Sequence, residues 1–331
     1  MQAVEQAGKV RIYGCGGCGI NLAAKVGAHP AELGLSAVEV VFVDTSRSNL
    51  KSASTEGIPS YLLDGVDGSG KIRRENSDAI ADRIGDLLLE HRPLDLNIVC
   101  FSSAGGSGSV FGPLIVKALL ERDAPVVAFM VGSVESAITA TNSLNTLKSL
   151  DVIADRAAAP LVVYYNQNRR DEPRSKVDAD FVNAMLAFRV LGSKQNEGLD
   201  SRDLQNFLRF DRACRAQPQL ALLEIIASRD VEEIASLGIN HVISVASIFR
   251  DTDALPFPLP NEYQATGYLP AGIGEAHPEE LHFVVHTDEV GKLLKSLTDS
   301  VKEFDDFAKS RSNKVRIVAD DEDTDASGLI L

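Results

Sequence analysis

The feature that most restricts the fold of this 331-residue chain is a glycine-rich loop that occurs twice. The first, GCGGCG at 14–19, follows the apolar run 9–13 and precedes an expected helix over 20–26. The second, within 101–113, follows the run 96–101 and precedes a helix over 112–122. A strand, a glycine loop and a helix form one unit of a parallel sheet, and the N–H groups of such a loop can hold phosphate. The sequence therefore predicts an α/β fold with a nucleotide site.

Further segments continue the alternation of strands and helices. Further candidate strands lie at 38–43, 125–131 and 160–165, and several of the strands in this first half are continuous β-branched runs, typical of strands that helices cover on both faces. Strands at 241–249 and 281–286 follow. Helical periodicity fits 77–91, 137–155, 178–191, 201–216, 228–238 and 288–309, and 166–176 is expected to be a long loop. We expect a doubly wound parallel-sheet domain followed by a smaller α+β domain.

Composition excludes some classes of function. The net charge of −14 disfavours direct binding to DNA or RNA, which needs positive charge to displace counterions from phosphates. No apolar run is long enough to span a membrane and no signal peptide is recognised, so we expect a cytoplasmic protein without a membrane partner. His282 and His286 are expected on a half-exposed strand face and not at a metal.

The first loop alone leaves several functions open. Gly14, Gly16 and Gly19 match the G-x-G-x-x-G pattern, and Asp44 ends the next strand, as in a NAD-binding Rossmann oxidoreductase. Cys15 and Cys18 form a C-x-x-C pair, which a redox or metal site could use, but no second pair completes a zinc site. We expect these cysteines to be small residues between glycines.

The second loop favours a triphosphate over a dinucleotide. A dehydrogenase has no use for another glycine and serine loop at its fourth strand, whereas two such loops can surround a triphosphate with N–H and hydroxyl groups. The segment GVDGSGKI at 65–72 approaches a P-loop, but Ile72 stands where a magnesium-binding hydroxyl would be. We expect it to be a polar loop near a phosphate.

The motifs then resemble one known family. AGGSGSV at 104–110 resembles the glycine signature of the tubulin and FtsZ superfamily, and GCGGCGIN at 14–21 resembles the family's first loop. GGSGSVFGPLI (105–115), MVGSVES (130–136) and LRFDR (208–212) are closest to the tubulins encoded by large bacteriophages. This resemblance covers nearly the whole chain. It implies a tubulin-like fold, with a GTP-binding domain, a central helix, a smaller α+β domain and a long C-terminal helix with an acidic tail.

The resemblance implies a site for GTP or GDP and Mg²⁺, with the metal near Asp44. The nucleotide-binding residues that it assigns are Gly16, Gly17, Cys18, Gly19, Asn21, Asp44, Thr45, Gly68, Ser69, Gly70, Lys71, Gly105, Gly106, Ser107, Gly108, Ser109, Glu135 and Asn168. Glu135 would bind the ribose and Asn21 the guanine. Asp178 and Asn183 compete for the second base-recognising position.

The resemblance also assigns catalysis to Asp200 and Asp203 in the loop 198–207. Acids of this loop enter the neighbouring subunit's pocket and orient water toward the γ-phosphate. Two acids three residues apart lie on one face of a helical turn, so both could address one water. The alternative is structural: Asp200 caps a helix and Asp203 is an acid of its first turn.

The resulting prediction is a GTPase that assembles head-to-tail with itself, with a spindle-like role in positioning viral DNA in the cytoplasm of a bacterial host. Five acids at 320–325 would dock on the adjacent subunit. The alternatives are the NAD-dependent oxidoreductase and a nucleotide-binding filament that does not hydrolyse. The expected parts are the GTP-binding domain (1–176), connecting and central helices with the catalytic loop (177–216), the smaller α+β or activation domain (217–287), and the C-terminal helix and tail (288–331).

Overall fold

The computed structural model describes residues 8–31, 35–50, 57–63, 65–66, 68–193, 199–269 and 277–311. The acidic segment 320–325, proposed to dock on another subunit, lies outside these residues.

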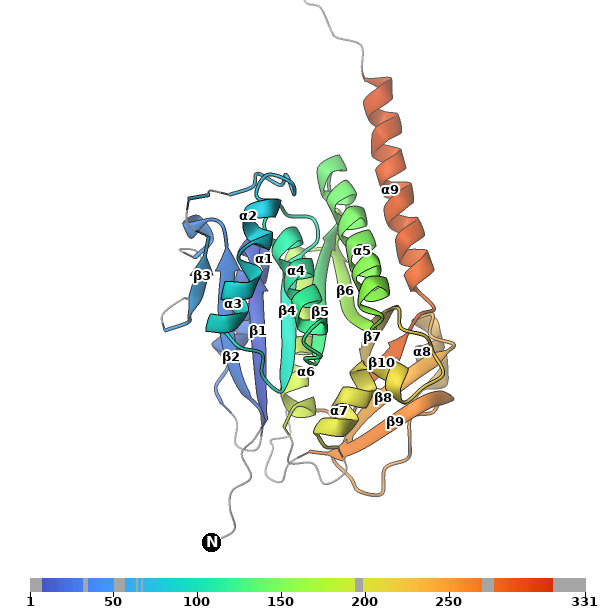
Figure 1. Ribbon diagram of the computed structural model, residues 1–331. Coiled ribbons are helices and arrows are strands. Elements are labelled where there is room, and N and C mark those ends of the chain that lie inside the picture. The colour runs from blue at the N-terminus through green and yellow to red at the C-terminus, as the bar shows by residue number, and fades with distance from the viewer. Residues whose placement is uncertain are drawn as a thin grey trace, which may run out of the picture.

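One mixed sheet runs through the molecule, in the strand order β3-β2-β1-β4-β5-β6-β7-β10-β8-β9 (Figure 1). Its strands are β1 (Lys9–Cys15), β2 (Ala37–Asp44), β3 (Ser60–Leu62), β4 (Leu96–Ser102), β5 (Val126–Ser133), β6 (Leu161–Asn168), β7 (Leu220–Ile226), β8 (Val242–Phe249), β9 (Asn261–Tyr268) and β10 (Glu280–His286). Every pairing between described strands is parallel except those of β10 with β7 and β8. The first seven strands therefore end at the same edge of the sheet.

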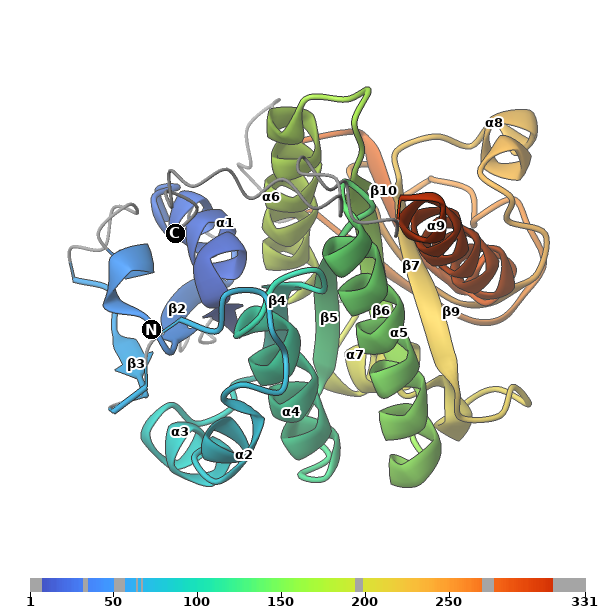
Figure 2. The same cartoon turned by 90° about the horizontal axis from the view of Figure 1, so that it is seen from above.

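Helices cover both faces of this sheet (Figure 2). They are α1 (Gly16–Gly27), α2 (Ser77–Ala81), α3 (Ile84–Glu90), α4 (Gly108–Leu120), α5 (Ala137–Ala157), α6 (Arg174–Leu191), α7 (Ser201–Leu208), α8 (Val231–Ser236) and α9 (Val290–Ser310). The apolar residues of α1, α6 and α7 form one core with the sheet, and those of α3, α4 and α5 form a second core on the other face. The doubly wound α/β architecture expected from the sequence is thus confirmed.

Aromatic rings that pack edge to face join the N-terminal and C-terminal parts of the sheet, on the face covered by α1, α6 and α7. The ring centroid of Phe188 on α6 lies 5.7 Å from that of Phe129 on β5 and 5.0 Å from that of Phe283 on β10. The smaller C-terminal part therefore shares its core with the N-terminal part, and the four-part division of the chain stays a prediction.

The C-terminal helix α9 packs along α5 and then extends past the edge of the sheet at which β1 and β4 end (Figure 1). Leu297 is its one buried residue among those described, and Phe307 near its end is exposed. Among the described residues, no helix is both long and apolar enough to cross a membrane.

Several expectations about individual elements were wrong. The pattern at 201–216 breaks at Arg209, whose ψ of 58° lies outside the helical range and ends α7, and the pattern at 77–91 is divided between α2 and α3. The strands β3, β7 and β9 were missed. His282 and His286 are fully buried rather than half-exposed, because β10 is an interior strand with helices or loops over both faces.

Candidate functional site

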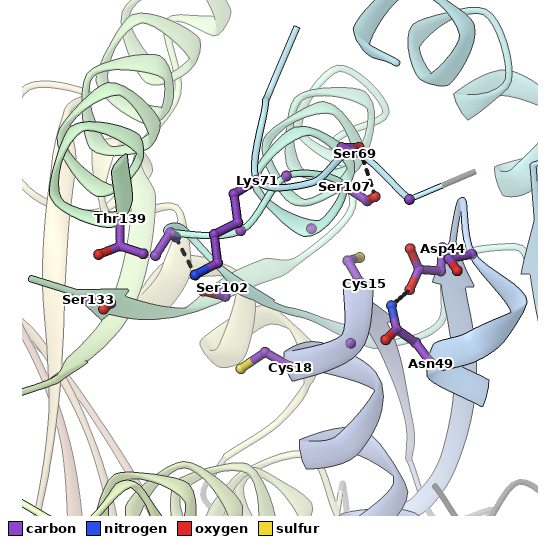
Figure 3. Close-up of a pocket in the computed structure, with 18 of the residues that line it drawn as sticks. Cys15, Cys18, Asp44, Asn49, Ser69, Lys71, Ser102, Ser107, Ser133 and Thr139 are labelled. Carbon is purple, nitrogen blue, oxygen red and sulfur yellow. Dashed lines mark hydrogen bonds between the residues drawn. The ribbon is translucent and has the colours of Figure 1, made fainter. Parts of the chain in front are cut away.

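The largest concentration of expected site residues lies in a cavity of about 390 Å³ at the carboxyl edge of the parallel strands. Loops after β1, β2, β4, β5 and β6 all reach it, together with the segment 68–71 (Figure 3). Ligand sites of open parallel sheets lie at this edge. The volume falls in the range of small-molecule sites, about 300–1,000 Å³.

The two glycine loops interlock at the base of this cavity. Gly16 has a φ of +67°, a backbone conformation that disfavours other residues, and a Cβ atom there would lie 2.9 Å from the Gly108 nitrogen. A Cβ atom on Gly108 would lie 2.7 Å from the Cys15 carbonyl oxygen. Glycine at both positions therefore lets the backbones at the N-termini of α1 and α4 pack directly against each other, because no side chain separates them.

These helix N-termini present backbone donors to the cavity. Neither Cys15 before α1 nor Ser107 before α4 makes a side-chain capping hydrogen bond. Amides in the first turn of a helix have no partner within that helix, and the helix dipole adds positive potential there. The pair of uncapped N-termini is suited to hold an anion such as a polyphosphate.

A chain of hydroxyl groups ties three loops together beside these helices. Ser107 Oγ lies 3.1 Å from Ser69 Oγ (Figure 3). It also lies 2.7 Å from Thr45 Oγ1. Asn142 on α5 donates to the carbonyl oxygens of Lys71, at 2.8 Å, and of Ala104. The loop at 68–71, which the sequence predicts to be near a phosphate, is therefore fixed against the second glycine loop.

Asp44 is the buried acid of the site. Its Oδ1 accepts a hydrogen bond from the Thr45 nitrogen at 2.7 Å and its Oδ2 accepts one from Asn49 Nδ2 at 2.6 Å (Figure 3). Burial raises the pKa of Asp44, while these hydrogen bonds act in the opposite direction. The side chains around it, Ser46 and Ser48, supply hydroxyl oxygens, and oxygen ligands are those that Mg²⁺ prefers.

Glu135 lies across the cavity from Asp44 and is held by an arginine. Arg174 makes three contacts of 2.8–3.1 Å with the carboxylate, and Ser133 Oγ donates to Oε2 at 3.0 Å. The hydrogen bond from Arg174 is the main cause that lowers the pKa of Glu135. Nearby, Asn168 Oδ1 is shielded from solvent and has no hydrogen-bond partner in the described part of the chain. A ligand with hydroxyl or amino donors would satisfy it.

Most expected nucleotide-binding residues line this one cavity: Gly16, Gly17, Cys18, Asp44, Gly68, Ser69, Gly70, Lys71, Gly105, Gly106, Ser107, Gly108, Glu135 and Asn168. Thr45 and Ser109 lie directly behind the lining, where Ser109 Oγ donates to the carbonyl oxygens of Gly105 and Gly106. Gly19 packs against the backbone of Cys100 on β4.

The three expected base-recognising residues lie outside the lining. Asn21 and Asn183 are exposed, and Asp178 pairs with Lys25 at 2.8 Å. Sequence reasoning missed the lining residues Ser46, Ser48, Asn49, Ser102, Ser133, Thr139 and Arg174. The polar run after Asp44 and the serines that end β4 and β5 were the signals that could have found most of them.

The cysteines of the first loop are not arranged for redox or metal chemistry. Burial raises the pKa of Cys18 to about 12 and that of Cys15 well above its usual value, so both thiols stay protonated at neutral pH. The described residues contain no group of three or more histidine, cysteine or acidic side chains that could hold a metal ion.

Asp200 and Asp203 lie at the opposite edge of the sheet. Asp200 borders a cavity with Leu94, Asp95 and Pro125, which come just before β4 and β5 begin. Asp200 Oδ1 accepts from the nitrogens of Arg202 and Asp203, and Asp203 Oδ2 accepts from the Asp200 nitrogen. Within one subunit the two acids thus form a helix cap and do not reach the main cavity.

Comparison with known proteins agrees with this geometry. Residues 9–168 match the model of the Tubulin/FtsZ family GTPase domain, and residues 199–290 match that of the phage tubulin-like protein C-terminal domain. The phage tubulin-like proteins of Pseudomonas phages PhiPA3 and 201phi2-1 are each 28% identical to the chain, over 98% of it and 99% of their own lengths. Among solved structures, the phage tubulin PhuZ with GDP has a TM-score of 0.84 at 28% identity, covering 97% of this chain and 99% of its own. The PhuZ201 filament has a TM-score of 0.82 at 26% identity, covering 97% and 99%.

A parallel sheet with two glycine loops at its carboxyl edge, continued by a phage tubulin-like C-terminal part, is the architecture of a tubulin-like GTPase. The chain belongs to the tubulin/FtsZ family and, within it, to the filament-forming phage tubulin-like proteins. The dehydrogenase alternative accounted for the first loop only, and the family assignment does not support it.

Gly105 and Gly106, which are adjacent in the second glycine loop, provide a test of how closely this loop packs against the segment 68–71. A Cβ atom on Gly106 would lie 2.5 Å from Ser69 Cβ, whereas one on Gly105 would meet nothing closer than 3.9 Å. Gly106→Ala is expected to lower the free energy of unfolding by about 1–3 kcal/mol, the usual effect of overpacking, and Gly105→Ala by less than about 0.5 kcal/mol. Thermal unfolding of the ligand-free variants measures the difference. Equal stability of the two variants would contradict the loop packing described here.

Proposed function

We propose that this chain binds and hydrolyses GTP and assembles head-to-tail into filaments, with Asp200 and Asp203 of one subunit completing the active site of the next. The observation that carries this proposal is that the carboxyl-edge cavity and Asp200 lie at opposite edges of the parallel part of the sheet. One subunit cannot bring them together, but a second subunit stacked on the first in the same orientation can. Because such a contact repeats without closing, it generates a filament.

The nucleotide would lie across the carboxyl edge of the sheet. Backbone N–H groups at the start of α1 and α4 would hold the phosphates, with Lys71 beside the γ-phosphate. Glu135 would accept hydrogen bonds from the ribose hydroxyls, and Asn168 would bind the nucleoside through its buried oxygen. Asn21 stays the predicted guanine contact, with Asp178 or Asn183 as the second.

The oxygen donors around Asp44 fit a hydrated Mg²⁺ ion. Both carboxylate oxygens of Asp44 already accept one hydrogen bond, so we propose that it holds the ion by remaining lone pairs or through water, assisted by the hydroxyl groups of Thr45 and Ser46. Bound Mg²⁺ would neutralise negative charge on the β- and γ-phosphates.

Hydrolysis needs little covalent chemistry from the protein. A water molecule held by acids of the neighbouring α7 would attack the γ-phosphorus, and the bond to the β–γ bridging oxygen would break to give GDP and phosphate. The loop N–H groups stabilise the charge on the phosphoryl oxygens as the bond breaks. A polymer that positions viral DNA in the host cytoplasm stays a prediction from the family resemblance.

Light scattering and phosphate release with GTP test the proposal. We expect both from the wild type, and polymers without release from Asp200→Asn/Asp203→Asn, because the pocket and the cap geometry stay intact while the water loses its acids. Asp230→Asn is the matched control, since Asp230 caps α8 through the nitrogens of Glu232 and Glu233 in the same way, and it should hydrolyse like the wild type.

Polymers without phosphate release in the wild type would favour the non-hydrolysing filament instead. Binding of NAD with no response to GTP would refute the proposal.

We also propose that the acidic segment docks on the next subunit in a groove between α2, α4 and α5. The groove has a volume of about 650 Å³, and its apolar lining residues include Val110, Leu114 and Ile153. Its charged lining residues are Arg73, Arg74, Lys117, Lys148 and Asp78, so positive charge predominates. Five acids at 320–325 followed by the apolar residues 329–331 complement it in charge and polarity. The 21 residues after α9 would reach at most about 75 Å when extended, and α9 itself extends past the carboxyl edge of the parallel strands, on which the next subunit would stack (Figure 1).

Deletion of 318–331 is expected to raise the critical concentration for polymerisation about tenfold, which corresponds to about 1.4 kcal/mol per contact. Arg74→Glu should raise it similarly in the full chain and have little further effect in the truncated one. Both effects should shrink at high salt, which screens exposed charges. Sedimentation with GTP over a range of protein concentrations measures the critical concentration. An unchanged critical concentration for the truncated chain would contradict the docking proposal.

A further inference from the structure

The two acids of α7 have different surroundings. Asp203 uses both carboxylate oxygens within its own subunit: Oδ2 accepts from the Asp200 nitrogen at 3.1 Å, and Oδ1 accepts from the Tyr263 hydroxyl at 2.8 Å. Asp200 uses only Oδ1, which accepts from the nitrogens of Arg202, at 2.7 Å, and Asp203, at 3.0 Å. Among the described residues, nothing hydrogen-bonds to Asp200 Oδ2.

The residue that holds Asp203 comes from the far end of the sheet. Tyr263 lies on the edge strand β9, and its half-buried ring packs against the first core. Burial, followed by the hydrogen bond to Asp203, raises the pKa of Tyr263, so the hydroxyl remains a donor at neutral pH. A second bond, from Ser244 Oγ on β8 to the Phe207 carbonyl oxygen at 2.8 Å, fixes the other end of α7. The first turn of α7 is thus held by the edge strand β9, and its last turn by the neighbouring strand β8.

We propose that the two acids divide the work, with Asp200 presenting the free carboxylate oxygen to the attacking water, and Tyr263 acting as a positioning residue through Asp203. This inference rests on the proposed GTPase function and deepens it.

Asp200 Oδ2 accepts a hydrogen bond from the water whose oxygen bonds to the γ-phosphorus. The bond from that phosphorus to the β–γ bridging oxygen breaks, and the water proton passes to phosphate or solvent. Asp203 fixes the turn 200–203, because its carboxylate bridges the start of α7 and the edge strand. A displacement of about 1 Å at such a turn is enough to cost a large factor in rate.

Tyr263→Phe removes only the hydroxyl and therefore tests the positioning role. In filaments formed above the critical concentration, we expect kcat for phosphate release to fall about tenfold, while the KM for GTP and the critical concentration change less than about twofold. Tyr165→Phe is the matched control, because the Tyr165 hydroxyl donates to Gln167 Oε1 at 2.8 Å and not to α7. It should leave kcat unchanged. Thermal unfolding of each variant is measured as well. A lower kcat with an unchanged unfolding midpoint indicates a misplaced Asp203 and not a general loss of structure.

A double-mutant cycle then isolates the pair. In the Asp203→Ala background, Tyr263→Phe should have no further effect on kcat. Asp200→Asn, which keeps a good helix cap, should cost at least about 100-fold, more than Asp203→Asn does. An unchanged kcat in Tyr263→Phe, additive effects in the cycle, or an equal or larger loss in Asp203→Asn would each overturn the inference. If the wild type binds GTP and assembles but releases no phosphate, the proposed function fails instead, and this inference with it.

Discussion

The common direction of the strands β1 to β7 is the constraint on which the rest of the account depends. Parallel strands place every carboxyl end, and so every loop that can cradle a phosphate, at one edge of the sheet. The start of α7, where Asp200 is the cap and Asp203 is in the first turn, lies at the opposite edge. In the proposed function these two regions are parts of one active site, and stacking of identical subunits in the same orientation is the operation that would join them.

At the carboxyl edge, the base of the cavity is formed by closely packed backbone and not by large side chains. Gly16 and Gly108 let the N-termini of α1 and α4 meet, and Ser107 links this junction to the loops that carry Thr45 and Ser69. The site therefore presents mostly amide and hydroxyl groups, with Asp44 and Glu135 each held in place by a neighbouring donor. Such a fixed set of dipoles stabilises transferring phosphoryl charge without reorganisation.

Much of this arrangement could be predicted from the sequence, because glycine loops after β-branched runs have few structural interpretations. The alternation of strands and helices, the shared site of the segments 14–19 and 104–109, and the loop at 68–71 were all found in this way. The residues that were missed depend on packing between distant segments. Arg174 meets Glu135 only because α6 starts beside the end of β5, and Tyr263 meets Asp203 only because β9 is the edge strand next to β8. The strand β9 itself was missed because its residues, from Asn261 to Tyr268, include few apolar side chains.

Complementation between two inactive variants tests most directly whether neighbouring subunits share an active site. Gly105→Phe should fill the phosphate site, since Gly105 lines the cavity and has open space around its Cβ position, while Asp200→Asn keeps the pocket and removes the acid. We predict that each variant alone releases almost no phosphate. An equal mixture that co-sediments should release it at about a quarter of the wild-type rate, because one junction in four pairs an intact pocket with an intact Asp200. A co-sedimenting mixture no faster than the sum of its parts would contradict the account.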